Sequence, residues 1–161
     1  MTESATGPSA PSTEDALDLL RSDHQRVDAM LADCERMVGG GDGGSEADRS
    51  GLVSRLGGLL IAHAQMEQQL FYPAIGLDAA QVSQASAEHA EVEASLQALS
   101  APDAAGFAAR IRTLAEQVRE HVRKEEAEFF PKATAAGIDL HALGTQMAMR
   151  RGELMGDQGI D

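Results

Sequence analysis

The stretch 63-HAQMEQQLFYP-73 places His63 and Glu67 four residues apart, on the face of an amphipathic helix where apolar residues are expected. The stretch 121-HVRKEEAEFFP-131 repeats this frame of histidine, glutamate, aromatic pair and proline at equal offsets. Residues four apart lie on one face of an α-helix, so the two side chains of each pair point in the same direction. The repeat therefore predicts two helices that each present a histidine and a carboxylate to a common interior.

Apolar residues around these stretches recur at spacings of three and four, which is the period of an amphipathic α-helix. The expected helices cover 14–38, 47–72, 80–99 and the segment from the turn at 100–103 to Pro131. Asp78 followed by Gln81 is typical of a capping pair at the start of the third helix. Pro73 and Pro131 are expected to end the second and fourth helices, because proline disfavours a helical conformation in the preceding residue. Four helices with short connections predict an all-α fold, an antiparallel up-down-up-down four-helix bundle.

The flanking segments differ in composition from the bundle, which is expected over residues 12–131. Residues 1–11 are rich in Ser, Thr, Pro, Ala and Gly and have no periodic apolar pattern, so a disordered leader is expected there. Residues 132–161 are expected to form a C-terminal tail or a short fifth helix that begins near Asp139.

Composition excludes several classes of function. A length of 161 residues is typical of one domain, and a net charge of −13 disfavours binding to nucleic acid or to anionic membranes, because phosphates would be repelled. No apolar run approaches the roughly 20 residues that span a bilayer. Cys34 is the single cysteine, and the first 15 residues lack the basic and apolar regions of a signal peptide. A cytoplasmic protein is therefore expected.

Two further histidines, His24 and His89, interrupt the apolar stripes of the first and third helices. At a rise of about 1.5 Å per residue, the heights of His24 and His63 in an antiparallel pair differ by about 3 Å. His89 and His121 match less well in height, although a later start of the fourth helix at Gly106 would reduce the difference. The bundle is thus expected to hold four histidines near one level.

These histidines would share the core with two glutamates, each one turn along its helix from a histidine. Burying imidazoles and carboxylates without partners costs hydration free energy, so such groups are normally paired or bound to metal. Nitrogen and carboxylate ligands suit iron, manganese or zinc, and the lack of thiolates argues against a structural zinc site. The candidate metal ligands are His24, His63, Glu67, His89, His121 and Glu125.

The order of the motifs resembles that of the hemerythrins and the hemerythrin-like HHE cation-binding domains, over roughly residues 14–131. A lone His, H-x-x-x-E-x-x-x-F-Y-P, a second lone His and H-x-x-x-E-x-x-x-F-F-P follow one another as in that family. The resemblance implies a four-helix bundle with a non-haem di-iron centre. It implies two iron ions with the four histidines as terminal ligands, bridged by Glu67, Glu125 and an oxo or hydroxo group.

Two positions depart from the oxygen-carrying hemerythrins. Those proteins carry a second histidine four residues from the one in the third helix, where this chain has Ala85 and Glu93. They also place an Asp five residues after the last histidine, where this chain has Glu125 at four and Glu126 at five. Two six-coordinate irons would then keep about two open positions, unless Glu93, Glu126 or Tyr72 fills one. Reaction with oxygen, peroxide or nitric oxide, including peroxide consumption or oxygen reduction, is expected in preference to reversible oxygen carriage.

Two other functions fit the same residues. One is an iron-sensing or redox-sensing module without turnover, since a metal-dependent core couples metal binding to folding. The other is a structural bundle whose polar core holds zinc or water. Ferritin-type iron storage is disfavoured because its Glu-x-x-His spacing is absent, and a zinc protease is disfavoured because His63 is followed by AQME.

Other ionisable and aromatic residues have simpler interpretations. His141 lies outside both motifs and is expected at the surface, and Tyr72 is expected to pack over the end of the core. The solvent-facing sides of the helices are expected to carry Glu88, Glu93, Glu120 and Glu126.

Overall fold

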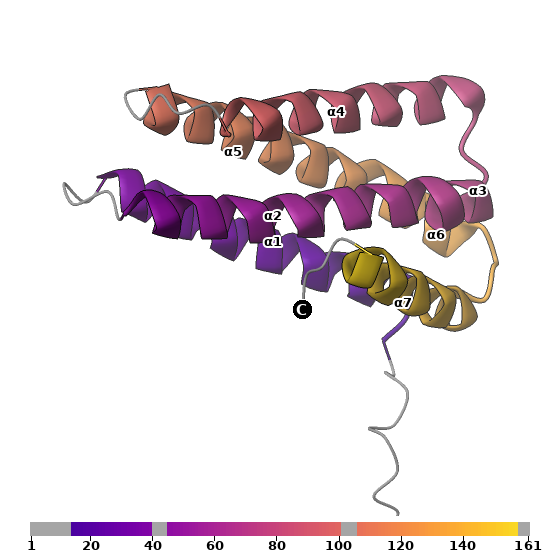
Figure 1. Cartoon of the computed structure of the whole chain (residues 1–161). Coiled ribbons are helices and arrows are strands. Elements are labelled where there is room, and N and C mark those ends of the chain that lie inside the picture. Colours follow the sequence, from indigo (N-terminus) through magenta and orange to yellow (C-terminus); the bar gives the residue numbers. More distant parts are fainter. Residues whose placement is uncertain (1–13, 40–44, 101–105, 158–161) are drawn as a thin grey trace, which may run out of the picture.

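The computed structural model describes residues 14–39, 45–100 and 106–157, and within these ranges every regular element is a helix. The predicted all-α fold is confirmed for this part of the chain. The four long helices are α1 (Ala16–Gly39), α2 (Glu46–Met66), α4 (Ala79–Ala98) and α5 (Phe107–Lys124) (Figure 1). The leader expected at residues 1–11 lies outside the described residues.

Side-chain caps fix the starts of α2 and α4. The Ser45 hydroxyl accepts a hydrogen bond from the Asp48 amide at 3.0 Å, and the Asp78 carboxylate accepts one from the Gln81 amide at 2.8 Å. Each cap satisfies an amide that has no partner inside the helix. The capping pair predicted from Asp78 and Gln81 is therefore confirmed.

The expectation that Pro73 and Pro131 end the second and fourth helices is wrong. In both places the helix passes through a π-helical turn and continues as a short α-helix. These segments are η1 (Glu67–Phe71) with α3 (Tyr72–Ile75), and η3 (Glu125–Phe129) with α6 (Phe130–Ala135). In η1 the Tyr72 amide bonds to the Glu67 carbonyl, five residues back. The extra residue places each proline in the first turn of a new α segment, where a missing N–H is tolerated.

The C-terminal segment forms α7 (Leu140–Asp157), a helix of 18 residues, longer than the tail or short helix expected there. Leu143, Met147 and Leu154 are buried on one face of α7. This helix packs against α1 and α2, beside the end of the bundle where the chain enters α1 (Figure 1). At Gly144 a Cβ would lie 2.7 Å from the backbone of Asp15 and Ala16, so the two segments meet at a position that has no room for a side chain.

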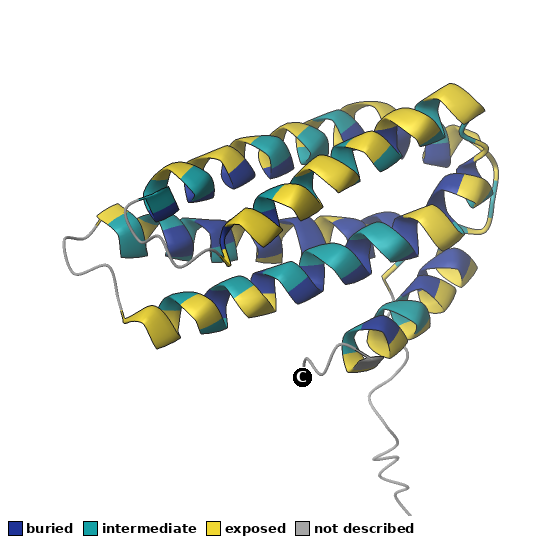
Figure 2. Cartoon of the chain, turned by 45° about the horizontal axis from the view of Figure 1, so that its top comes forward, coloured by how far each residue is buried: buried dark blue, intermediate teal, exposed yellow. Residues whose placement is uncertain are grey.

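The long helices enclose an interior toward which their buried residues face (Figure 2). Helix α1 packs against α2 and α5, and α4 packs against α5 and less extensively against α2. One apolar cluster contains Leu20, Phe71, Phe130 and Met147, and a second contains Leu31, Leu56, Leu96 and Ile111. The candidate metal ligands lie on α1, α2, α4 and α5 and at the first residues of η1 and η3. Within the described ranges, no helix is long and apolar enough to cross a membrane.

Candidate metal centre

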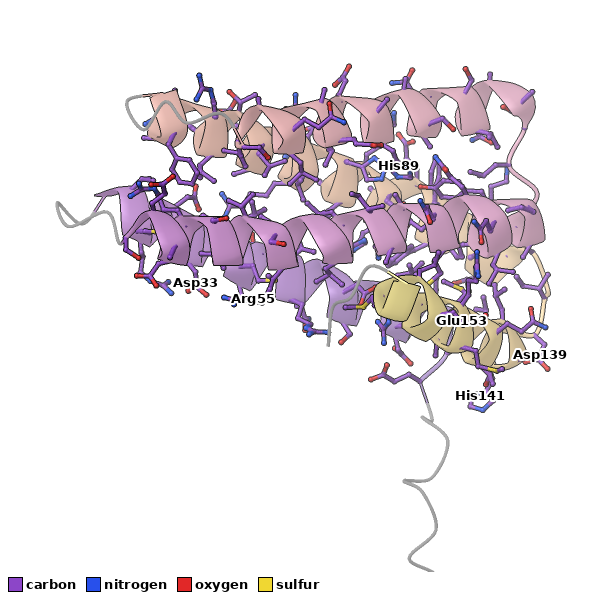
Figure 3. The ribbon with its side chains drawn as sticks, in the orientation of Figure 1. Asp33, Arg55, His89, Asp139, His141 and Glu153 are labelled. Carbon is purple, nitrogen blue, oxygen red and sulfur yellow. The ribbon has the colours of Figure 1, made fainter. Side chains whose placement is uncertain are left out.

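The six predicted residues meet in the interior of the bundle. Their ligand atoms fall into two groups, in each of which the atoms lie within 4.8 Å of one another. One group contains His24, His63, Glu67 and Glu125, and the other contains Glu67, His89 and His121. Glu67 and Glu125 are at most 1% exposed. Figure 3 shows His89 between α4 and the helices opposite it. The geometry gives two neighbouring groups of residues that could each hold a metal ion and that have Glu67 in common.

Each carboxylate lies between two imidazoles. The Nε2–Oε distances are 3.1 Å for His24 and Glu125, 3.3 Å for His63 and Glu67, 3.4 Å for His89 and Glu67, and 3.4 Å for His121 and Glu125. In each glutamate one oxygen faces the histidine of its own helix, four residues earlier, and the other oxygen faces a histidine from another helix. This is the arrangement expected of a carboxylate that bridges two metal ions.

The outward-facing Nδ1 atoms of the four imidazoles also have partners. His24 donates to Glu126 at 2.7 Å, His63 to Asp23 at 2.9 Å and His121 to Glu88 at 2.6 Å, while Nδ1 of His89 lies 3.0 Å from Nε2 of Gln68. A proton fixed on Nδ1 leaves the Nε2 lone pair free for a metal. For His89 this requires the Gln68 amide to turn its oxygen toward the ring.

These partners follow an approximate internal two-fold symmetry. Asp23 precedes the lone His24 and contacts the motif histidine of α2, and Glu88 precedes the lone His89 and contacts the motif histidine of α5. Likewise the residue that follows each candidate glutamate ligand contacts a lone histidine. The repeated sequence frame thus corresponds to a repeated three-dimensional unit around the two metal positions.

Two aromatic side chains occupy equivalent places but differ by one hydroxyl. Phe130 stacks on His24 with ring centroids 5.9 Å apart, and Tyr72 stacks on His89 with centroids 6.1 Å apart. Tyr72 therefore lies against the metal centre as well as packing at the end of the core. Burial and the neighbouring glutamate charges raise the pKa of Tyr72, so the phenol keeps its proton.

The charge balance of the cluster keeps two of the imidazoles, those of His63 and His121, protonated when no metal is bound. Burial lowers the pKa of His63, but the charge of Glu67 and the hydrogen bond to Asp23 outweigh it and raise this pKa well above its ordinary value. For His121, burial is likewise outweighed, chiefly by the hydrogen bond to Glu125, and the pKa rises to about 9. A metal ion would take the place of the Nε2 protons.

Cations neutralise two of the outer carboxylates. Lys124 donates to Glu88 at 2.9 Å, and Arg151 of α7 donates to Asp23. Burial raises the pKa of Glu88, but hydrogen bonds from Gln84, Lys124 and His121 outweigh it and lower the pKa to about 2. Glu88 is therefore ionised at neutral pH and holds the His121 ring in a fixed orientation.

One buried atom has no hydrogen-bond donor. Oε2 of Glu67 is inaccessible to solvent, and no described residue donates a hydrogen bond to it, although His63 Nε2 lies 3.3 Å away. An anionic oxygen left in this condition is costly, and a bound cation would satisfy it. Four imidazole nitrogens and two carboxylates form a donor set that suits iron, manganese or zinc. The residues present therefore fit a metal centre.

Comparison with known families agrees with this geometry. The family model of the hemerythrin HHE cation-binding domain matches residues 15–133, well over half of the chain. The chain belongs to the hemerythrin HHE family. No curated protein and no solved structure matches this hemerythrin-like chain. The matched region contains all six candidate ligands and ends before α7.

Sequence reasoning missed part of the site. Glu126 is exposed as expected and, as one of the residues considered near the metal, contacts His24, whereas the contact of Glu88 with His121 was not predicted and Asp23 and Arg151 were not singled out. A signal was present for Asp23, because it directly precedes a lone histidine. In agreement with expectation, His141 is exposed and points away from the bundle (Figure 3).

A cavity of about 210 Å³ leads to the histidines of this hemerythrin-like centre. It lies between α2 and α4, the two long helices that pack together less extensively. Its walls are largely apolar, and all four histidines line it, together with Leu60, Ile61, Val92, Leu96 and Val118. Glu93, which lines the cavity, is exposed. The cavity offers small molecules a path to the cluster.

Proposed function

We propose that this chain is a non-haem di-iron protein of the hemerythrin HHE family that binds or reacts with small oxidants such as oxygen, peroxide or nitric oxide. The metal ligands in this proposal are His24, His63, Glu67, His89, His121 and Glu125. The glutamates would bridge two irons that also share an oxo or hydroxo group. The proposal includes the antiparallel up-down-up-down arrangement of four helices, supported by the packing of α1 with α2 and of α4 with α5.

The observation that carries the proposal is the buried Oε2 of Glu67, which no described residue satisfies although it faces imidazole nitrogen. An apolar or water-filled core would not require an ionised oxygen at this place. The two-fold arrangement of the surrounding groups supports a pair of ions, because each half supplies two imidazoles and one carboxylate.

The protein residues perform three tasks in this function. The outer carboxylates hold the Nδ1 protons of His24, His63 and His121, and the Gln68 amide takes this place for His89, so that Nε2 of each imidazole faces inward as a lone-pair donor. Tyr72 keeps its proton close to both bridging glutamates and can donate it to a small ligand. The apolar cavity walls limit the site to small molecules and restrict water. Iron, when bound, would supply reversible one-electron chemistry and open positions for a ligand.

The proposed ligands are small diatomic molecules or peroxide, with no nucleic acid and no membrane. The net charge of −13 supports the exclusion of nucleic acid. A cytoplasmic location is part of the proposal, and the single cysteine supports it.

Rapid mixing tests this function. Protein loaded anaerobically with iron(II) is mixed with oxygen, and the oxidised protein is mixed separately with hydrogen peroxide and with azide. We expect rapid oxidation in air, peroxide consumption and azide binding. Reversible oxygen uptake that argon undoes, together with no peroxide consumption, would contradict the expected preference for reaction over oxygen carriage, and no response to oxygen, peroxide or azide would contradict the proposal. The variant His141→Ala is the matched control, because it removes an exposed histidine far from the cluster in sequence.

A further inference from the structure

Helix α7 is connected to the candidate metal ligand His63 through the side chains of Arg151 and Asp23. Arg151 donates a hydrogen bond to Oδ1 of Asp23, and Oδ2 of Asp23 accepts one from Nδ1 of His63 at 2.9 Å. The carboxylate of Asp23 therefore uses one oxygen for the guanidinium and the other for the imidazole. The three residues come from α7, α1 and α2, so the contact joins separate parts of the chain.

Asp23 depends on both partners because it is 1% exposed. A buried carboxylate that loses a charged partner leaves one oxygen without a donor, and it must then reorient or admit water. Each of these changes would alter the acceptor that fixes the His63 ring. Arg151 therefore controls the orientation of His63 without contacting it.

The packing of α7 against α1 fixes the position of Arg151. Leu143, Met147 and Leu154 are buried on its inner face, and Gly144 lies against the backbone at the start of α1. The family match ends at residue 133, so α7 lies outside the domain that carries the six candidate ligands. A helix outside the matched domain thus contributes a charge to the surroundings of its metal site.

In the half of the centre that contains His89 and His121, the corresponding positive charge comes from a lysine of the bundle itself. Lys124 donates to Glu88 at 2.9 Å, and Glu88 accepts from Nδ1 of His121 at 2.6 Å. Lys124 lies on α5, three residues after His121. The two cations occupy corresponding places in the two-fold arrangement, but one of them depends on α7.

We infer that Arg151 is a positioning residue for metal binding, which acts through Asp23 on His63 and makes α7 an integral part of the centre. This inference rests on the proposed function, because it assumes that His63 binds metal. Loss of the Arg151 charge should weaken metal binding in the half of the site that contains His24 and His63, while the half that contains His89 and His121 keeps its own cation.

The experiment compares full-length variants in anaerobic titrations with iron(II) against a chromophoric chelator. Substituting an outer partner of a metal-bound histidine typically lowers metal affinity by about 10–100-fold, so Asp23→Asn is expected in this range and Arg151→Met below it. Arg151→Lys should restore part of the affinity, because it restores the positive charge. Arg150→Met is the matched control, since Arg150 lies on the same helix and bonds to Gln69 instead of Asp23.

A double-mutant cycle separates positioning from general stability. If Arg151 acts through Asp23, Arg151→Met will lower metal affinity in the wild-type background and have no further effect in the Asp23→Asn background. Equal losses in both backgrounds, or equal losses for Arg150→Met and Arg151→Met, would overturn the inference.

A second readout does not require iron. In the metal-free protein, the Nδ1 proton of His63 should give a hydrogen-bonded resonance in nitrogen-15 NMR that moves in Arg151→Met and returns toward its original position in Arg151→Lys. Failure of the wild-type protein to bind iron would reject the proposed function, whereas an unmoved His63 resonance would reject the role of Arg151.

Discussion

The Tyr72 hydroxyl donates a hydrogen bond to Oε2 of Glu125 at 2.9 Å and also lies 3.2 Å from Oε1 of Glu67. A single phenol thus supports both carboxylates that we propose as metal bridges. Phe130, at the equivalent place in the other half, has no hydroxyl to do the same. The two halves of the centre are therefore chemically different despite their similar geometry.

Replacing Tyr72→Phe should destabilise the metal-free protein by about 1–3 kcal/mol, because two buried carboxylates lose a hydrogen-bond donor. Urea unfolding of the metal-free protein measures this loss. The iron content of the loaded variant should remain that of the wild type, since none of the six proposed ligands is removed. A lower iron content at unchanged folding would contradict this expectation and show that Tyr72 contributes to iron binding, either as a ligand or through its hydrogen bonds to Glu67 and Glu125.

Removing the metal should weaken the bundle. A ligand that binds the folded state alone stabilises it by about 2.7 kcal/mol when its free concentration is about 100 times Kd. The metal-free protein should therefore melt at a lower temperature and exchange amide hydrogens faster around His24, His89 and His121. His121→Ala should bind less iron even where its helix content persists. Identical melting curves with and without metal would show that the cluster does not stabilise the bundle.

The stability of the metal-free protein should fall as pH rises from neutrality. The pKa of His121 is about 9 in the folded protein, against 6.5 for an ordinary histidine, so the folded state holds this proton more tightly. Its stabilising contribution, on the order of 3 kcal/mol, is full below pH 6.5 and is lost as pH rises through 9. Urea unfolding of the metal-free protein across this range measures the decline.

His121→Gln provides the comparison for the pH experiment, because glutamine does not titrate. Its stability should decline less than that of the wild type over the same range, although His63 still contributes. A wild-type stability that stays constant between these pH values would contradict the charge balance described for the cluster.

Access to the centre should depend on the cavity between α2 and α4. Val92 lines this cavity and lies one turn along α4 from His89. Val92→Phe should narrow the cavity and slow azide binding severalfold, while Val92→Ala should leave the rate unchanged or increase it. Stopped-flow absorbance of the oxidised protein gives both rates, and iron content serves as the control. Equal rates for the two variants would mean that ligands approach by another route.

Periodicity predicted the helical fold because the apolar stripes are regular and the polar residues that interrupt them recur in one frame. It did not predict that the helices pass Pro73 and Pro131. A proline normally marks a boundary, and the π turns that accommodate it leave no pattern in the apolar spacing. Each π turn begins at one of the two candidate glutamate ligands, so this irregularity belongs to the site.

The six candidate ligands were accessible to sequence reasoning because a buried histidine or glutamate on an apolar stripe is conspicuous. Most of their outer partners were not, since Glu88, for example, has the spacing of a solvated residue and contacts a histidine of another helix. Arg151 lies 128 residues from Asp23, and no local pattern connects them. Contacts between residues so far apart in the sequence can be identified only from the three-dimensional structure.

The most direct test of the central claim is the number and identity of the metal ions bound per chain. Elemental analysis of the protein loaded anaerobically with iron-57 and then oxidised, combined with Mössbauer spectroscopy, gives both the stoichiometry and the coupling between the ions. Two irons per chain, antiferromagnetically coupled through a shared bridge, are the predicted result. One isolated iron per chain, or zinc that excludes iron at equal stoichiometry, would contradict the di-iron centre.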